Sequence, residues 1–231
     1  MKNRITAFLI ILFVCALSPH PSSLLAEEVE TQGYKVDGDV KDFLEDFKEA
    51  IDEMDTYTFL MSVENWEGKR HEKMLSRFCF KKPNLIRMEV LEGRKRGSTV
   101  VLNKEGSIRG RNNFGLTLTL KPHNKRLQNI RGGTFLRASL ADKWSRINDQ
   151  ITNKGCRAKI KEEELGDREV YHLHIYHNNT YNDATDEDLW VDKETFFISK
   201  NVIYVDDKVV SDVNWSQHEA NIPLDDSLFK Q

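Results

Sequence analysis

The segment Phe78-Cys79-Phe80-Lys81-Lys82-Pro83-Asn84-Leu85-Ile86-Arg87-Met88-Glu89-Val90 decides the fold. Pro83 fixes its own φ angle and has no N–H to donate to a strand ladder, so the segment predicts two strands separated by a Pro-Asn turn. After the turn, apolar and charged residues alternate. A period of two is typical of a sheet that has one apolar and one solvated face.

The first 26 residues have the pattern of a secretory signal peptide. Lys2 and Arg4 precede an apolar run over 5–17, and a Ser-Pro break leads to Ala26. We expect cleavage after Ala26 and export to a bacterial periplasm or an extracellular space. The apolar run is too short to span a bilayer. Two alternatives are an uncleaved N-terminal anchor and lipidation of Cys15.

The remaining chain predicts a flexible leader over 27–38 and a single domain over 39–231. The full chain of 231 residues has a net charge of −3. This near-neutral charge argues against binding of nucleic acid, which requires a basic face. We expect a monomer. After the signal peptide the sequence has two cysteines, Cys79 and Cys156, which form either one disulfide or two buried free thiols.

A helix is predicted to begin at Asp39, with Asp37 or Asp39 as its cap. Apolar residues recur along it at helical spacing: Val40, Phe43, Leu44, Phe47, Ile51 and Met54. A second helix is predicted after Gly132-Gly133, with Thr134 as its cap. Its apolar stripe consists of Leu136, Leu140, Trp144, Ile147 and Ile151.

Alternating segments separated by turn residues fill the rest of the chain, which is the pattern of antiparallel hairpins. They predict about eleven strands in meander order with two helices, a mainly β fold with helices (α+β). The strands are expected from Tyr57, at 71–81, 85–91, 98–103, 107–111 and 116–120, and then at 156–165, 168–177, 186–192, 196–205 and 208–220.

The apolar sides of these strands gather into one face. Its members are Tyr57, Phe59, Met61, Val63, Met88, Val90, Leu116, Leu118, Leu120, Leu173, Ile175, Leu189, Val191, Val213 and Trp215. Two interpretations stay open, because periodicity does not separate them. The face either forms an ordinary core closed by the helices, or it lines a cavity that the helices cover loosely and that holds an acyl chain.

Two polar groups invite a metal hypothesis. His172 and His174 lie two apart on one strand, with His177 nearby, and imidazoles at that spacing can share a metal. No nearby cysteine completes the set, and a solvated sheet face is the alternative. Asp183, Asp186, Glu187 and Asp188 could attract calcium, but the central glycine of an EF-hand loop is absent. We expect an acidic solvated loop there and no metal site.

The remaining motifs favour binding over catalysis. The sequence has no Gly-x-Ser-x-Gly, no phosphate loop and no His-Glu-x-x-His. We therefore expect no enzyme, no catalytic residue and no cofactor. The tripeptide Arg94-Lys95-Arg96 could touch an anionic lipid surface, with a solvated loop tip as the alternative.

Three stretches carry a resemblance to a known family. They are Phe80-Lys81-Lys82-Pro83-Asn84-Leu85-Ile86-Arg87-Met88, then Asp188-Leu189-Trp190-Val191-Asp192-Lys193-Glu194-Thr195, and Asn221-Ile222-Pro223-Leu224-Asp225-Asp226-Ser227-Leu228-Phe229. With the order of elements, they resemble the LolA/LolB-like periplasmic lipoprotein carriers, and this chain is similar to an exported member of that superfamily.

The resemblance implies a curved antiparallel half-barrel lidded by two helices, whose concave apolar face holds acyl chains of lipids or lipoproteins. It also implies an inner- or outer-membrane protein as a further partner. The lid residues would be Phe43, Phe47, Leu140, Trp144 and Ile147. In the carriers an arginine before the motif's proline latches the lid, and Lys82 stands at that position here. A sensor or protein-interaction module of the same fold, without bound lipid, is the alternative.

Overall fold

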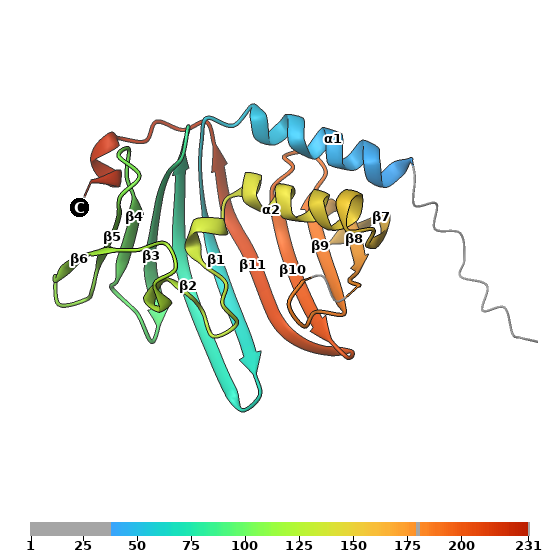
Figure 1. Ribbon diagram of the computed structural model, residues 1–231. Helices are drawn as coiled ribbons and strands as arrows, with labels where there is room; N and C mark the ends of the chain where they lie inside the picture. The colour runs from blue at the N-terminus through green and yellow to red at the C-terminus, as the bar shows by residue number, and fades with distance from the viewer. Residues whose placement is uncertain (1–37, 179–180, 231) are drawn as a thin grey trace, which may run out of the picture. The chain divides into compact units, whose positions relative to one another are not determined.

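The computed structural model describes residues 38–178 and 181–230 (Figure 1). These residues belong to one compact unit, Tyr34–Gln231. The expected signal peptide, most of the leader and the candidate cap Asp37 lie outside the described residues. Within the described part of the chain, no helix has both the length and the apolar character needed to cross a membrane.

The described chain forms one open antiparallel sheet of eleven strands, as the alternation predicts. The strand order is β6-β5-β4-β3-β2-β1-β11-β10-β9-β8-β7, so the first and last strands pair at the centre. The strands are β1 Thr56–Glu67, β2 Arg70–Lys81, β3 Leu85–Gly93, β4 Thr99–Leu102, β5 Ile108–Arg111, β6 Thr117–Leu120, β7 Arg157–Leu165, β8 Arg168–Tyr176, β9 Asp186–Asp192, β10 Ile198–Val205 and β11 Lys208–Ala220.

Stacked aromatic rings join β1 to β2 on the inner face of the sheet. Tyr57 lies opposite Phe80, and Phe59 lies opposite Phe78, with ring centroids 4.8 Å apart in both pairs. Cross-strand aromatic pairs of this kind favour one register, because a slip by one residue would move every ring to the other face. The predicted alternation of inward and outward side chains is therefore present in β2, up to the Pro-Asn turn.

The first helix, α1, spans Asp39–Asp52 and buries the predicted apolar stripe. The prediction of its cap is wrong for Asp39, which lies inside the helix. Gly38 occupies the cap position, and as a glycine it has no side chain that could accept a capping hydrogen bond. Phe43 packs edge-on against Tyr171 of β8, with ring centroids 5.3 Å apart. The helix thus covers the end of the sheet that contains β8.

The second helix begins later than predicted. Thr134 caps a short 3-10 helix, η2 Phe135–Arg137, through a hydrogen bond from the N–H of Leu136. The helix α2, Leu140–Asn148, begins after Ser139, whose hydroxyl accepts from the N–H of Asp142. Two capping side chains five residues apart divide the predicted helix in two. A π-helical turn, η3 Asp149–Asn153, then completes the segment before β7.

A second, smaller core lies on the other face of the sheet. It contains Cys79, Leu85, Val101 and Phe229, the last from the short helix η4 Asp226–Phe229. Cys156 belongs to the main core instead. Both cysteines are buried and free, so the free-thiol alternative holds over the disulfide.

Candidate functional site

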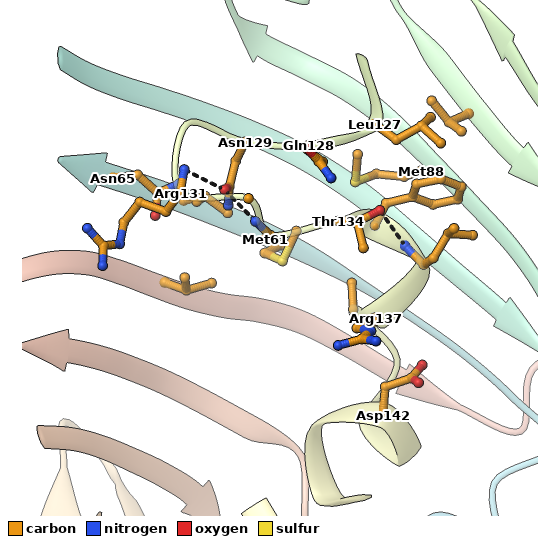
Figure 2. Close-up of a pocket in the computed structure, with 18 of the residues that line it drawn as sticks. Met61, Asn65, Met88, Leu127, Gln128, Asn129, Arg131, Thr134, Arg137 and Asp142 are labelled. Atoms are coloured by element: carbon orange, nitrogen blue, oxygen red, sulfur yellow. Dashed lines mark hydrogen bonds between the residues drawn. The ribbon is translucent and has the colours of Figure 1, made fainter. Parts of the chain in front are cut away.

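A large open cavity lies between the inner face of the sheet and the segment that follows β6. Its volume is about 1560 Å³. The sheet side of the cavity is made by β1–β6, β10 and β11. The other side is made by residues 121–139, here called the strap, and by α2 (Figure 2). Apolar strands therefore form its floor, and a mostly polar segment forms its cover.

The cavity divides the predicted apolar face into two parts. Nine of its residues line the cavity: Met61, Val63, Met88, Val90, Leu116, Leu118, Leu120, Val213 and Trp215. The other six do not line the cavity and are buried in the main core, to which Met61, Val63 and Trp215 also belong: Tyr57, Phe59, Leu173, Ile175, Leu189 and Val191. Whether the lining part holds an acyl chain stays a prediction.

Hydrogen bonds to the sheet and to the loop between β3 and β4 hold the strap over the cavity. The Nζ of Lys95 donates to the backbone carbonyls of Arg126 and Gln128, at 3.3 and 3.2 Å. The backbone N–H of Ile130 donates to a carboxylate oxygen of Glu72 at 3.0 Å. Arg131 donates to the carbonyl of Trp66 at 3.2 Å. Lys95, expected in a basic loop tip, therefore anchors the strap.

The two helices contribute differently to the cavity. No residue of α1 is among its lining residues, whereas α2 supplies Asp142, Lys143 and Arg146. The apolar stripe of α2 points the other way, and Leu140 and Ile147 are at most 1% exposed. The predicted lid residues Phe43, Phe47, Leu140, Trp144 and Ile147 therefore pack in or against the main core.

Lys82 contacts the C-terminal end of α1. Its Nζ donates to the backbone carbonyl of Asp52 at 2.6 Å and lies 3.2 Å from the carboxylate of Asp55. A cation at a helix C-terminus is favourable, because the last carbonyls carry partial negative charge. The Lys82 side chain is 40% exposed, and its role as a latch stays a prediction.

A buried ion pair lies behind α2, at the edge of the cavity. Arg146 donates two hydrogen bonds to Glu187, which is 0% exposed, and the longer of them is 2.8 Å. Glu187 also accepts from Asn201 at 2.8 Å and contacts His177 at 3.1 Å. Burial opposes its ionisation, but Arg146, His177 and Lys143 together hold the pKa of Glu187 well below its ordinary value.

Lys143 lies beside this pair and lines the cavity. Its Nζ donates to Oδ1 of Asn201 at 2.8 Å and lies 5.8 Å from the centre of the Trp215 ring. Burial, together with the charge of Arg146, lowers the pKa of Lys143 to about 7, although Glu187 acts in the opposite direction.

Cations outnumber acids on the cavity walls. Among the described lining residues, eight are Lys or Arg and three are Asp or Glu, although the whole chain has a net charge of −3. The cations are Lys95, Arg111, Arg126, Arg131, Arg137, Lys143, Arg146 and Lys154, and the acids are Glu72, Asp142 and Asp149.

The histidines of the first motif contact carboxylates of the acidic motif, in two separate groups. His172 and His174 both contact the carboxylate of Asp188, at 2.8 and 2.7 Å, whereas His177 contacts Glu187. Over 38–178 and 181–230, no three His, Cys, Asp or Glu side chains form a group suited to a metal ion. The prediction of an acidic solvated loop is wrong for Asp186, Glu187 and Asp188, which belong to β9, where Glu187 is buried.

Known structures share this architecture. An uncharacterised conserved protein from Thermus thermophilus matches with a TM-score of 0.53 and 12% identity, over 83% of this chain and 93% of that one. A DUF1329 family protein from Desulfovibrio piger matches at 0.45 and 12%, over 82% and 95%. A LolA superfamily protein from Nitrosomonas europaea matches at 0.40 and 13%, over 81% and 97%.

These matches concern the fold alone, because all of the identities are low. The superfamily named by the sequence resemblance is represented among these matches. No family model matches the sequence. No curated protein matches it significantly either.

Sequence reasoning missed the strap and the polar group around Lys143. One signal was present in β9, where Glu187 falls in phase with the buried Leu189 and Val191. A charged residue in the apolar phase of a strand indicates a buried partner rather than a loop. The partner, Arg146, lies on a distant helix and could not be identified by spacing.

Proposed function

We propose that this chain is an exported binding protein that holds acyl chains of a lipid or lipoprotein in the cavity between the sheet and the strap. The observation that carries the proposal is an open cavity of about 1560 Å³ with an apolar strand floor. This volume exceeds the roughly 300–1,000 Å³ typical of small-molecule pockets. A ligand with a long hydrocarbon chain fits such a space better than a compact polar one.

The energetics support an acyl ligand. Burial of a hydrocarbon chain contributes about 0.8 kcal/mol per CH₂ group. A chain of about sixteen carbons therefore gains on the order of 10 kcal/mol before the costs of binding are subtracted. The floor contains Met61, Met74 and Met88, whose flexible thioether side chains adapt to chains of different shape. In this proposal the signal peptide over 1–26 directs the protein to the periplasm.

A protein partner is the second candidate. The strand β6 is an edge of the sheet, and Phe114, in the turn before it, is 89% exposed. Leu116 and Leu118 beside it are 59% and 39% exposed. An exposed apolar edge strand can pair with a strand of another protein. A sensor or interaction module would use this edge and leave the cavity without lipid.

The test is lipid extraction from protein secreted into a bacterial periplasm and purified without detergent. Mass spectrometry of the organic extract should find acyl lipid in near-stoichiometric amount. Met88→Glu, which places a carboxylate on the cavity floor, should reduce the amount at least several-fold. The control is Leu228→Asp, at a site 36% exposed and remote from the cavity lining. An extract without lipid, together with a stable protein partner, would favour the second candidate.

A further inference from the structure

The helix α2 is oriented with its polar side toward a cavity whose floor is apolar. Its apolar residues Leu140 and Ile147 face the main core, while Lys143 and Arg146 line the cavity. A carrier that held only hydrocarbon would gain nothing from ammonium and guanidinium groups at this wall, since charged groups lose hydration there. The polar wall therefore indicates a ligand that has a polar part of its own.

The charge of Arg146 is already neutralised within the protein. Its guanidinium forms a two-pronged ion pair with Glu187, whose remaining capacity is taken by Asn201 and His177. Each charge of this pair is compensated and hydrogen-bonded by the other. Arg146 thus has no free charge to offer a ligand.

Lys143 differs from its neighbour in this respect. Its hydrogen-bond partner is the neutral amide oxygen of Asn201, and among the described residues no carboxylate lies within 4.0 Å of its Nζ. Lys154, which also lines the cavity, has Asp149 at 3.0 Å. Lys143 is therefore a half-buried amine with no carboxylate in direct contact, and one or two further N–H donors remain for an anion.

An apolar track runs from this ammonium group across the sheet. Asn201 pairs with Val213, Val213 with Val63, and Val63 with Met74, and all four residues line the cavity. Met88, Val100, Gly110 and Leu118 continue the lining to β6. Seven inter-strand spacings of about 4.8 Å separate β10 from β6, which gives a path of roughly 34 Å. The track has space for one long alkyl chain.

We propose that the ligand is an anionic amphiphile whose carboxylate or phosphate head pairs with Lys143, while its alkyl chain lies on the floor formed by β11, β1, β2 and β3. This inference rests on the proposed function and specifies the chemical class of the ligand. Hydrogen bonds to a charged head add specificity to the nonspecific burial of the chain.

The test compares ligands that share one chain and differ in their heads. Isothermal titration calorimetry at pH 7 would measure palmitate, hexadecyl phosphate, hexadecanol and hexadecyltrimethylammonium on the detergent-free, delipidated protein. We expect the anions to bind at least about tenfold more tightly than the alcohol, and the cation to bind most weakly. The tighter binder of palmitate and hexadecyl phosphate shows whether the site prefers a carboxylate or a phosphate head.

Lys143→Met should weaken palmitate binding about tenfold and remove the preference for anions, and the control Lys154→Met should keep the preference. Equal binding of anion and alcohol by the wild-type protein, or a preference that survives Lys143→Met, would overturn the inference while leaving the proposed function intact. Failure of all four ligands to bind would overturn both. If Lys143→Met does not fold, the wild-type comparison still decides.

Discussion

The indole Nε1 of Trp144 donates a hydrogen bond to the backbone carbonyl of Leu44, 2.7 Å away. This bond joins α2 to α1 and fixes the two helices that cover one end of the sheet. Trp144→Phe keeps most of the ring and removes the donor. Because the carbonyl of Leu44 also belongs to the α1 ladder, it stays bonded, and we expect a loss of only about 1 kcal/mol of unfolding free energy.

Urea unfolding monitored by circular dichroism would measure this change. Trp66→Phe is the matched control, because Trp66 is half-buried near the end of β1 and stacks on His71. A loss as large in the control as in Trp144→Phe would show that the hydrogen bond between the helices contributes nothing specific.

Phe47 should be the most sensitive position of α1. It is 0% exposed and packs near Phe43 and Phe196. Phe47→Ala should cost about 3–5 kcal/mol through the cavity it creates, and Phe47→Asp should cost more, because it buries an unpaired carboxylate. Lys41→Asp, on the exposed side of the helix, is the control. A melting temperature unchanged by Phe47→Asp would mean that this stripe does not pack on the sheet.

Lys82 should hold the C-terminal end of α1 by its contact with the carbonyl of Asp52. Lys82→Met should raise hydrogen exchange in the last turn of α1, with a loss of about 1 kcal/mol or less, because the side chain is partly exposed. Lys81→Met is the matched control. Its Nζ donates to the carbonyl of Leu224, so we expect faster exchange in the C-terminal segment and not in α1. Identical exchange patterns in the two variants would contradict the assignment.

Glu187 should make the protein sensitive to acid. The pKa of its carboxyl lies well below the ordinary value of 4.5, so its ionised form stabilises the fold above that pH. This stability is lost as the pH falls through the lowered pKa. Glu187→Gln leaves Arg146 buried without a counter-charge and should cost about 3–5 kcal/mol at pH 7.

As the pH falls below the ordinary value of 4.5, the two proteins should begin to converge, because the carboxyl of the unfolded wild-type chain takes up a proton, and convergence should be complete only when the pH has fallen through the lowered pKa of the folded protein. Unfolding free energies measured from pH 7 to pH 3 would show this as a shallower pH dependence in the variant. Asp183→Asn, at a carboxylate that is 60% exposed, is the control and should cost about 1 kcal/mol or less. Parallel curves for wild type and Glu187→Gln would contradict the role given to this carboxyl.

Palmitate affinity should fall as the pH rises above 7. Burial and Arg146 lower the pKa of Lys143 to about 7, so the free protein loses this ammonium charge in alkaline solution. Binding of an anion then requires uptake of a proton, which weakens binding with each unit of pH. The other charged groups that face Lys143 are Arg146, which lowers its pKa, Glu187, which raises it, and Asp142, which lines the same cavity. Hexadecanol carries no charge and should bind with little dependence on pH, and a matching decline for the alcohol would contradict the prediction.

Much of the fold was readable from the sequence, because period-two alternation and turn residues are local signals. The Pro83-Asn84 turn, the stripe of α1 and the meander of strands all rest on such signals. The start of α2 was misplaced because Thr134 and Ser139 are both good caps, and only packing decides between them. The local sequence therefore does not show which of the two residues caps α2.

The site was readable only in part. The sequence predicts an apolar face, and Met61 and Met88 do line the cavity. It does not separate them from Tyr57, which does not line the cavity, because all three belong to the apolar phase of their strands. That distinction depends on where the helices end and the strap begins. Pairing of Arg146 with Glu187 joins residues 41 positions apart, so no pattern of spacing indicates it.

The most direct test of the central claim is to locate the bound chain by photocrosslinking. Palmitic acid with a diazirine near the end of its chain would be bound, irradiated and mapped by peptide mass spectrometry. Labels are expected on cavity-lining strands, in peptides that contain Met61, Met88 or Val213, and an excess of unmodified palmitate should prevent them. Labels confined to the outer-face core around Cys79, or spread over the surface and insensitive to competition, would contradict the claim that the cavity holds an acyl chain.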